Sequence, residues 1–337
     1  MRRWSSARPG SGCLAVADIL VLAGGVGGAK FVDGLAQAVG QPRLTIIGNT
    51  GDDAEFHGLW VSPDLDILTY TLADVVDHAK GWGYRDETFA TQDRLKALGN
   101  ATWMNLGDRD LATHILRTGL RHQGERPTAI AGRIARQLSV SATLLPPCDN
   151  NLQTLIDTPA GTLNFQEFFV RDRCGPPIRD VRYAGAETAR PTPEVLSAIA
   201  TAQLILIAPS NPIASIGPIL AVPGIREALA SAPAPRLAIS PIVRGRSLKG
   251  PSDRMLRAKG FRSDPTGVAA CYAGLIDAMV IDVRDRRHGD ALRAADLSVG
   301  VLDTIMRDRL DRSRLAGQVL AYAAELATRR DAMRRSA

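Results

Sequence analysis

Four aspartates that could hold a metal ion lie close together near the start of the sequence, at Asp52, Asp53, Asp64 and Asp66. So many carboxylates in one place repel one another and need a compensating cation. Oxygen ligands without a histidine pair fit Mg²⁺ best, and Mg²⁺ commonly assists reactions at phosphate groups. The alternative is that these residues only form turns and helix starts.

A glycine-rich turn that could bind a phosphate precedes the aspartates. The apolar run 19–23 predicts a buried strand, and the pattern of residues 31–39 predicts a helix. The turn between them contains Gly24, Gly25, Gly27 and Gly28. Glycine lets a ligand approach the backbone closely, and the free N–H groups at a helix start attract phosphate. A turn that only connects the strand to the helix is the alternative.

Lys30 is the residue at which this turn differs from the dinucleotide-binding sequence fingerprint. In that fingerprint a third glycine, which packs the helix on the strand, stands where this chain has Lys30. A lysine cannot provide this packing, but it can pair with an anion. The turn therefore indicates a site for a nucleotide or another phosphorylated small molecule.

A compact group of alternating charges, Asp108, Arg109 and Asp110, begins another expected helix. Arg109 could hold a phosphate through two parallel hydrogen bonds. His114 follows Asp110 by four residues, which places both on one helix face as a candidate base and its orienting partner. A surface ion pair and a structural histidine are the alternatives.

Two further loops carry polar side chains that could contact a ligand. Ser210 and Asn211 lie in a loop that two prolines make rigid, and such a loop could contact a base or a ribose. The alternative for Asn211 is a set of local hydrogen bonds within the turn. Lys249 lies in a basic loop, where it could cover a diphosphate or be only solvated.

The elements that must position these residues follow an alternating order of strands and helices. This order predicts an α/β fold, with a Rossmann-like, mostly parallel sheet flanked by helices over residues 18–337. The expected strands are 19–23, 43–48, 203–208, 236–243 and 278–283. Because the carboxyl ends of parallel strands share one edge, the glycine-rich turn and the loop of Asp52 and Asp53 should be neighbours.

A smaller α+β region is expected to be inserted at about residues 140–190. It should contain a meander of strands at 141–145, 152–157 and 162–169, with a soft boundary near residue 150. Residues from 301 onward are expected to form mostly one long helix. Residues 1–17 combine arginines with Pro, Gly and Ser, and are expected to be a disordered extension.

The charge distribution fits a small anionic substrate better than a nucleic acid. The formal net charge is +6, and the arginine-rich runs 284–293 and 307–335 are interleaved with acids. We interpret these runs as solvated helix faces, with no nucleic-acid-binding stripe expected. No apolar run reaches membrane-spanning length, so no membrane contact is expected.

The cysteines indicate a reducing compartment. None of them lies in a C-x-x-C pair, and no histidine spacing beside them suggests zinc. We therefore expect reduced thiols and a cytoplasmic protein. The four cysteines are Cys13, Cys148, Cys174 and Cys271.

In combination, these motifs resemble those of the 2-phospho-L-lactate transferase family of coenzyme F-420 biosynthesis. The likeness covers about residues 18–283, and nine motifs occur in the family's order. They read LAGGVGGAK, NTGDD, HGL, SPDLD, GWGYRDET, LGDRDLATHILR, APSNPIASIGPIL, VPGIREAL and AISPIV.

The resemblance implies a Mg²⁺-dependent phosphotransferase that acts as a homodimer. Its acceptor would be the deazaflavin FO, and its donor a three-carbon acid linked to guanosine diphosphate. The terminal hydroxyl of the FO ribityl chain would attack the phosphorus next to the acid, and GMP would leave. The acid could be phospholactyl, phosphoenolpyruvyl or phosphoglyceryl, and the sequence leaves this choice open.

The resemblance also implies roles for residues of the matching motifs. Asp64 and Asp66 would be catalytic and bind the metal, with Asp53 as a further ligand, and Asp66 would also contact FO. The glycine-rich turn, Lys30, Ser210 and Asn211 would hold the guanosine diphosphate part. The residues beside FO would be Asn105, Asp108 and Arg109.

Two other functions compete with this one. A nicotinamide-dependent dehydrogenase would explain the glycine-rich turn, but Lys30 and the surplus of acids disfavour it. A non-catalytic, sugar-nucleotide-binding regulatory protein would share the turn, but its acidic pair should run into a Gly-Gly-Ser-Ser stretch. Here Asp52 and Asp53 run into Ala54 and Glu55 instead.

Overall fold

The centre of the molecule is a parallel sheet, which the computed structural model describes together with the rest of residues 18–336. Among these residues it has seven strands, in the order β14-β13-β10-β9-β1-β2-β5. All neighbouring pairs run parallel, which confirms the predicted Rossmann-like α/β fold. The strands are β1 (Ile19–Ala23), β2 (Leu44–Gly48), β5 (Thr143–Leu145), β9 (Leu204–Ile207), β10 (Arg236–Ile239), β13 (Ala278–Asp282) and β14 (Ser298–Leu302). Residues 1–17, the expected extension, lie outside the described part.

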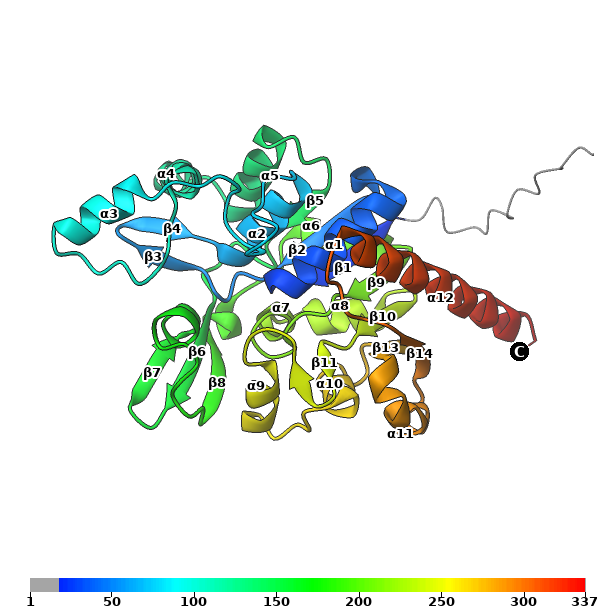
Figure 1. Cartoon of the computed structure of the whole chain (residues 1–337). Coiled ribbons are helices and arrows are strands. Elements are labelled where there is room, and N and C mark those ends of the chain that lie inside the picture. The colour runs from blue at the N-terminus through cyan, green and yellow to red at the C-terminus, as the bar shows by residue number, and fades with distance from the viewer. Residues whose placement is uncertain (1–17, 337) are drawn as a thin grey trace, which may run out of the picture.

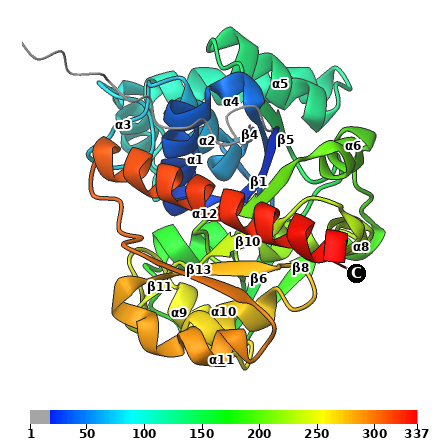
Figure 2. The ribbon, with the colours of Figure 1, turned by 90° about the vertical axis from the view of Figure 1, so that its right-hand side faces the viewer.

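Two hydrophobic cores lie on the two faces of this sheet, because successive side chains of a strand point to opposite sides. Val21 of β1 packs with the helices of one face, and Leu22 packs with those of the other. Figures 1 and 2 show α1 and α12 side by side on the first face. The helices of that face are α1 (Gly25–Val39), α2 (Pro63–Leu72), α5 (Pro127–Gln137) and α12 (Arg309–Ser336). The opposite core includes α6 (Pro193–Thr201), α7 (Gly217–Ala221), α8 (Ile225–Ser231), α9 (Ser252–Ala258), α10 (Pro265–Cys271) and α11 (Gly289–Arg293).

The expected meander is a separate antiparallel sheet, and its composition differs from the prediction. It consists of β6 (Gln153–Thr158), β7 (Gly161–Asn164) and β8 (Asp180–Ala184), in the order β7-β6-β8. Residues 143–145 instead join the main sheet as β5. The strand expected at 162–169 ends early, because Asn164 and Glu167 accept hydrogen bonds from each other's backbone N–H and begin a helical turn at 167–171.

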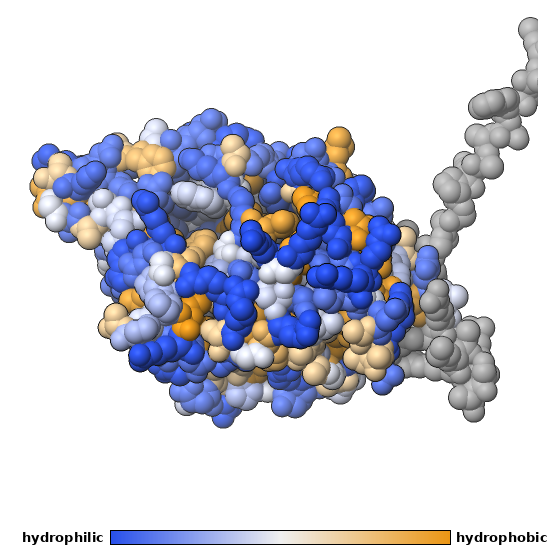
Figure 3. Space-filling view, turned by 60° about the horizontal axis from the view of Figure 1, so that its bottom comes forward, coloured by the Kyte–Doolittle hydropathy of each residue, from blue (hydrophilic) through white to orange (hydrophobic). Residues whose placement is uncertain are grey.

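The remaining elements surround the carboxyl edge of the main sheet. The hairpin of β3 (Ala54–Phe56) and β4 (Leu59–Val61) packs with the start of α4 (Asp108–His122), and α3 (Ala90–Ala97) lies beside α4 in Figure 1. A second small hairpin pairs β11 (Ile242–Val243) with β12 (Arg246–Ser247). Figure 3 shows a face on which hydrophilic residues make up most of the surface. No helix within residues 18–336 has the length and apolar character to cross a membrane.

The long C-terminal helix α12 begins at Arg309, later than the expected residue 301, because Ser298–Leu302 form β14, and it is fastened to α1. A Cβ at Gly34 of α1 would lie 2.2 Å from the carbonyl oxygen of Arg312, so the two backbones touch. Beside this contact, the Arg312 guanidinium donates to Asp33 over 2.9 Å, and both side chains are buried. Lys30 also donates to the carbonyl oxygen of Met306, just before α12. The position of α1 therefore depends on α12.

Replacing Arg312 should destabilise the protein strongly. Arg312→Ala removes the buried partner of the Asp33 carboxylate and leaves it only the exposed Arg309, 3.6 Å away, so the loss should approach the roughly 3–5 kcal/mol of a broken buried pair. Arg307→Ala is the matched control, because Arg307 is 57% exposed and its pair with Asp311 should contribute less than about 1 kcal/mol. Urea unfolding of both variants measures the difference, and equal midpoints would contradict the prediction.

Candidate functional site

The loops after β1 and β9 meet at the point where the strand order of the main sheet reverses. From β1 the chain builds outward through β2 and β5, whereas β9, β10, β13 and β14 extend the sheet the other way. Parallel sheets bind ligands at such a switch point. Here Ser210, after β9, accepts a hydrogen bond from the Gly24 N–H over 3.1 Å and donates one to the Gly24 carbonyl over 2.8 Å.

The glycines after β1 allow the first turn of α1 to lie against its neighbours. A Cβ at Gly27 would lie 2.6 Å from the carbonyl oxygen of Pro209, and one at Gly28 would lie 2.5 Å from Ser210 Oγ. The helix begins at Gly25, earlier than the sequence pattern predicted, so these glycines belong to the helix itself. Its free N–H groups therefore stand at the switch point, where an anion could bind.

Asp64, in the first turn of α2, faces this first turn of α1. A Cβ at Gly24 would lie 2.5 Å from Asp64 Oδ2, and Asn49 Nδ2 donates to the same oxygen over 2.9 Å. Burial raises the pKa of Asp64 to about 6, although hydrogen bonds from Asn49 and the Gly25 backbone oppose the shift. Asp64 is therefore a buried carboxylate beside the candidate anion site.

Asp52 and Asp53 add two more buried carboxylates. Asp53 Oδ2 accepts hydrogen bonds from Ser62 Oγ over 2.7 Å and Trp60 Nε1 over 3.2 Å. Ser62 stands just before α2, and its hydroxyl donates to Asp53 instead of capping the helix. Burial raises the pKa of Asp53 to about 7, and burial together with the charge of Asp64 raises that of Asp52 further above its usual range.

The chemistry of this carboxylate group fits a divalent cation. Asp52 Oδ1 and Asp53 Oδ1 are buried and have no hydrogen-bond partner among the described residues. The hydroxyl oxygen of Thr50, Oγ1, is likewise buried without such a partner. Leaving buried charged oxygens without a partner is costly. A magnesium ion with oxygen ligands would satisfy them. The candidate ligands are Asp53 and Asp64 of the predicted set together with Asp52, although the ligand atoms of these three do not all lie within 4.8 Å of one another in the described part of the chain.

Asp66, the third predicted ligand, is held elsewhere. The Arg117 guanidinium donates hydrogen bonds to both carboxylate oxygens of Asp66, and the bond from Nη1 to Oδ2 is 3.1 Å long. Both side chains are buried, and Arg117 comes from α4. Asp66 therefore joins α2 to α4, and in this arrangement its oxygens are already occupied.

His114 and Asp110 lie beside this ion pair. Arg117 Nη1 is 3.1 Å from His114 Nδ1, so Nδ1 accepts and the ring proton lies on Nε2, which is 3.6 Å from Asp110 Oδ1. Tyr70 donates to the same Asp110 oxygen over 2.7 Å. Burial lowers the pKa of His114 to about 4, and burial and the charge of Asp66 raise that of Asp110 to about 7.

This second cluster is better suited to a structural role than to a metal site. Asp66, Asp110 and His114 have ligand atoms within 4.8 Å of one another, the one such group of three in the described part of the chain. However, the positive charge of Arg117 among them disfavours a cation. His114 is also buried and neutral at physiological pH, which supports the structural interpretation over that of a catalytic base.

The predicted residues around α4 organise a neighbouring loop. Asp108 accepts hydrogen bonds from the Thr88 hydroxyl and from the N–H groups of Ala90 and Thr91, which hold its pKa well below the usual range. Arg109 donates to a carbonyl oxygen in the same loop, that of Arg85, over 2.9 Å. Asn105 is exposed just before the helix. The contacts of Asp108 and Arg109 thus run to residues 85–91.

Asn211 shapes its own loop. Its Oδ1 accepts hydrogen bonds from the N–H groups of Ile213 and Ala214, over 3.0 and 3.2 Å. These are the local bonds of the alternative interpretation, and they hold the loop after β9 in place.

Three lysines, Lys30, Lys80 and Lys249, lie near the first turn of α1. Lys249 donates to the carbonyl oxygen of Lys80 over 3.4 Å, and a Cβ at Gly81 would lie 3.0 Å from Val26 Cγ1 in that turn. Burial, followed by the charges of Arg312 and Lys249, lowers the pKa of Lys30. Such a concentration of positive charge would attract an anionic ligand to the helix start.

Comparison with known proteins identifies the family of this chain. A family model described as 2-phospho-L-lactate transferase CofD matches residues 19–312. The chain belongs to this family. A phosphoenolpyruvate transferase of Streptomyces coelicolor is 41% identical over 91% of this chain and 98% of its own length. A 2-phospho-L-lactate transferase of Methanosarcina mazei is 35% identical over 90% of this chain and 100% of its own.

These relatives confirm the family resemblance and the prediction of a transferase. A crystal structure of a UPF0052-family protein from Bacillus halodurans shares the fold, with a TM-score of 0.62, 16% identity, and coverage of 90% of this chain and 99% of that one. The dehydrogenase and the regulatory protein gain no support from membership in the CofD family.

Sequence reasoning missed two residues of the site in this CofD family member. Arg117 follows Asp110 and His114 at helical spacing, seven and three residues away, and this spacing could have placed all three on one face. Asn49 stands at the carboxyl end of β2, directly before the acidic loop. Its position at the carboxyl edge of the sheet could have identified Asn49 as a site residue.

The Asp66–Arg117 pair should be energetically coupled. Asp66→Asn leaves a buried guanidinium without its counter-ion and should cost about 3–5 kcal/mol of stability. Adding Arg117→Met removes the stranded charge, so the double variant should be more stable than the sum of the two single losses predicts. A double-mutant cycle by urea unfolding measures this coupling, and strictly additive effects would argue against it.

Mg²⁺ binding to the carboxylate group should strengthen as the pH rises. The raised pKa values of Asp53 and Asp64 mean that both carboxyls take up protons on folding, a stabilisation that is present below about pH 4 and is lost as the pH rises through about 6 to 7. Mg²⁺ needs the ionised forms, so it should raise the melting temperature more above that window than below it.

The matched control for the Mg²⁺ measurement is Asp53→Asn, which removes one ionisable oxygen from the group. This variant should show a smaller Mg²⁺-induced increase in melting temperature and a weaker pH dependence. An increase that is independent of pH in the unaltered protein would show that Mg²⁺ binds elsewhere.

Proposed function

We propose that this protein transfers a phosphorylated three-carbon acid from a guanosine-diphosphate-linked donor to the deazaflavin FO and releases GMP. The observation that carries the proposal is the match of the CofD family model across residues 19–312. The site supports it, because a helix start and three lysines suit a diphosphate, and buried carboxylates beside them suit Mg²⁺.

The relatives favour an enolpyruvyl donor. The Streptomyces coelicolor protein at 41% identity is named a phosphoenolpyruvate transferase, whereas the Methanosarcina mazei protein named for 2-phospho-L-lactate is 35% identical. A phosphoenolpyruvate transferase of Mycobacterium leprae is 37% identical. We therefore rank phosphoenolpyruvyl before phospholactyl and phosphoglyceryl as the group transferred.

Some residues of the site would hold the donor and FO, and others would neutralise the negative charge of the phosphate groups. The first turn of α1, with Lys30 and Lys249 at its rim, would bind the diphosphate, and the loop of Ser210 and Asn211 would border the guanosine. FO would lie on the side of Asn105, Asp108 and Arg109. Bound Mg²⁺, held by Asp53 and Asp64, would withdraw charge from the phosphate oxygens.

Positioning and charge neutralisation suffice for this reaction. The FO ribityl hydroxyl forms a bond to the phosphorus beside the acid, loses its proton, and the bond from that phosphorus to GMP breaks. Phosphoryl-type transfers of this kind depend mainly on alignment and electrostatic stabilisation. Asp66 contributes to the reaction indirectly, because its bond to Arg117 fixes the start of α2, where Asp64 lies.

We also propose that the reaction takes place in the cytoplasm. The cysteines of the described part, Cys148, Cys174 and Cys271, are free thiols. Burial raises the pKa of each of them, which keeps the thiols protonated and unreactive.

A direct assay tests the proposed transfer. The protein is supplied with FO, Mg²⁺ and each guanylated acid in turn, and mass spectrometry follows GMP and the phosphodiester product. We expect turnover with the enolpyruvyl donor to exceed that with the other two. Formation of GMP without the FO product, or no GMP from any donor, would contradict the proposal.

The matched variants are Asp64→Asn and Asp93→Asn, which remove one carboxylate charge each. Asp64 faces the first turn of α1, so its variant should lose at least about a hundredfold in kcat, the scale of a lost electrostatic contact in a transition state. Asp93 is exposed on α3, and its variant should keep full activity. Full activity in both variants would exclude the carboxylate group from the reaction.

A further inference from the structure

The two carboxylate oxygens of Asp53 differ in their contacts. Oδ2 accepts hydrogen bonds from Ser62 Oγ over 2.7 Å and from Trp60 Nε1 over 3.2 Å. Oδ1 is buried and has no hydrogen-bond partner among the described residues. The hydroxyl and the indole therefore hold one oxygen and leave the other for a ligand. Metal-binding carboxylates are commonly oriented in this way by neighbouring donors.

Strand β4 directs the side chain of Trp60 toward Asp53. Successive side chains of a strand point to opposite sides, and Leu59 and Val61 pack in the hydrophobic cluster of the β3–β4 hairpin. Trp60, between them, therefore points to the other side of the hairpin, where its indole N–H reaches Asp53.

Helix α4 fixes the orientation of this indole. The backbone N–H of Trp60 donates to Thr118 Oγ1 over 2.8 Å, and the guanidinium carbon of Arg121 lies 4.0 Å from the ring centroid. Thr118 and Arg121 are three residues apart, so both lie on one face of α4. Arg121 is itself held by Asn151, whose Oδ1 accepts a hydrogen bond from it over 3.0 Å. The indole N–H is therefore aimed at Asp53 by contacts on both sides of the residue.

An indole is suited to orienting a carboxylate that binds a cation. Its N–H only donates, and it offers no lone pair that would compete for the ion. The two donors to Asp53 are also neutral, so they leave its negative charge in place. Asp66 differs, because its hydrogen bonds come from the charged guanidinium of Arg117.

We propose that Trp60 is a positioning residue for the divalent cation, and this inference rests on the Mg²⁺ requirement of the proposed function. The Trp60 N–H and the Ser62 hydroxyl together restrict rotation of the Asp53 carboxylate about its Cβ–Cγ bond. Without the N–H the carboxylate can turn, and Oδ1 can then accept the bond from Ser62. That oxygen would be lost to the cation. Trp60 thus acts through Asp53 and does not touch the ion.

Removing the indole N–H alone tests this role. Trp60→Phe keeps an aromatic ring beside Arg121 but deletes the donor, so Mg²⁺ should bind about tenfold more weakly, as when other supporting contacts of metal ligands are lost. Trp103→Phe is the matched control, because Trp103 packs edge-on against Phe56, with ring centroids 5.2 Å apart. Its affinity for Mg²⁺ should be unchanged. Isothermal titration calorimetry with MgCl₂, without FO or donor, measures both affinities.

A second variant removes the other donor to the same oxygen. Ser62→Ala deletes the hydroxyl that donates to Asp53 Oδ2, so it should also weaken Mg²⁺ binding. Urea unfolding of all three variants shows whether each is folded. A loss of Mg²⁺ affinity in a folded Trp60→Phe protein separates positioning of the carboxylate from simple packing.

NMR of the indole groups provides a measurement on the unaltered protein. Each tryptophan gives its own indole N–H resonance, and the single Trp→Phe variants identify those of Trp60 and Trp103. Mg²⁺ should shift the Trp60 resonance, because the cation withdraws charge from the carboxylate that accepts its hydrogen bond. The Trp103 resonance should stay in place.

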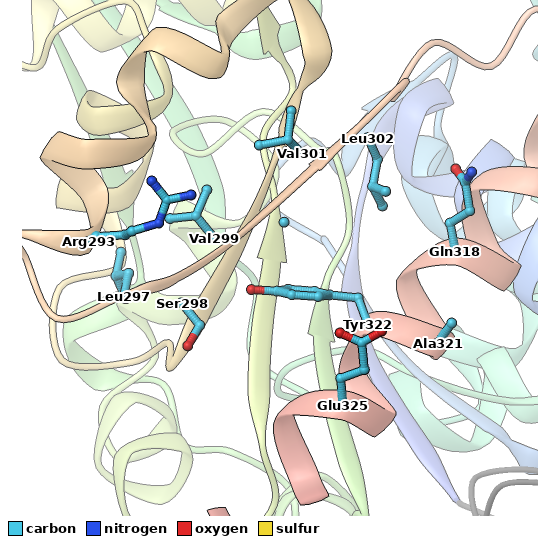
Figure 4. A pocket seen from close by; sticks show the side chains of 11 residues that line it. Arg293, Leu297, Ser298, Val299, Val301, Leu302, Gln318, Ala321, Tyr322 and Glu325 are labelled. Atoms are coloured by element: carbon cyan, nitrogen blue, oxygen red, sulfur yellow. The ribbon is translucent and has the colours of Figure 1, made fainter. Parts of the chain in front are cut away.

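A groove between β14 and α12 provides the control for Mg²⁺ bound elsewhere. It has a volume of about 650 Å³, and Figure 4 shows Glu325 on its wall beside Tyr322. In the main sheet β13, β10, β9 and β1 lie between β14 and β2, the strand that precedes Asp53. Glu325→Gln should therefore leave Mg²⁺ binding unchanged. A loss equal to that of Trp60→Phe would place the ion in the groove and overturn the proposal.

Three further outcomes would overturn it. The first is a folded Trp60→Phe protein that binds Mg²⁺ as tightly as the unaltered protein, the result expected if water rather than a cation is the partner of Asp53 Oδ1. The second is a Trp60 resonance that saturating Mg²⁺ does not move. The third is an unaltered protein that binds no Mg²⁺.

The FO transfer assay distinguishes this proposal from the proposed function. Weaker Mg²⁺ binding by Trp60→Phe, together with no FO transfer by the unaltered protein, would support the role of Trp60 and contradict the proposed function. FO transfer together with unchanged Mg²⁺ affinity in Trp60→Phe would overturn the role of Trp60 alone.

Discussion

The structure depends on how closely the first turn of α1 approaches the loop after β9. Cβ atoms at Gly27 and Gly28 would lie 2.6 and 2.5 Å from atoms of Pro209 and Ser210, distances that no side chain tolerates. The same close packing brings Asp64 against Gly24. The start of α1, a rigid loop and a buried carboxylate are therefore brought together by the absence of side chains at three positions.

Two aspartates only two residues apart in α2 have opposite roles. Asp64 accepts hydrogen bonds from two neutral groups, the Asn49 side chain and the Gly25 backbone, and burial raises its pKa, so it remains able to accept a cation. Asp66 is neutralised by Arg117, and the resulting ion pair fixes α2 on α4. Burial alone does not distinguish the two side chains. The nearest positive group decides which carboxylate can serve a ligand and which supports the fold.

The parts of this arrangement that are local in sequence were predictable, and those that depend on distant partners were not. The glycine-rich turn and the strand runs identified the parallel sheet, because strand ends and helix starts leave short-range patterns. The role of Asp66 depends on Arg117, 51 residues later. Residues 143–145 were assigned to the wrong sheet because the residues of a strand do not specify which strand it pairs with. β14 escaped notice because Ser298 and Gly300 interrupt its apolar run.

The attachment of α12 gives the end of the chain an influence on the start of α1, the candidate anion site. Asp33 and Arg312 join this helix to α1, and Lys30 reaches back to Met306 just before it. A protein shortened before Arg309 would expose the apolar side of α1 and remove Arg312, the buried partner of Asp33. The final thirty or so residues therefore support the helix that begins at the glycine-rich turn, so a fusion or truncation there should alter the carboxyl edge of the sheet.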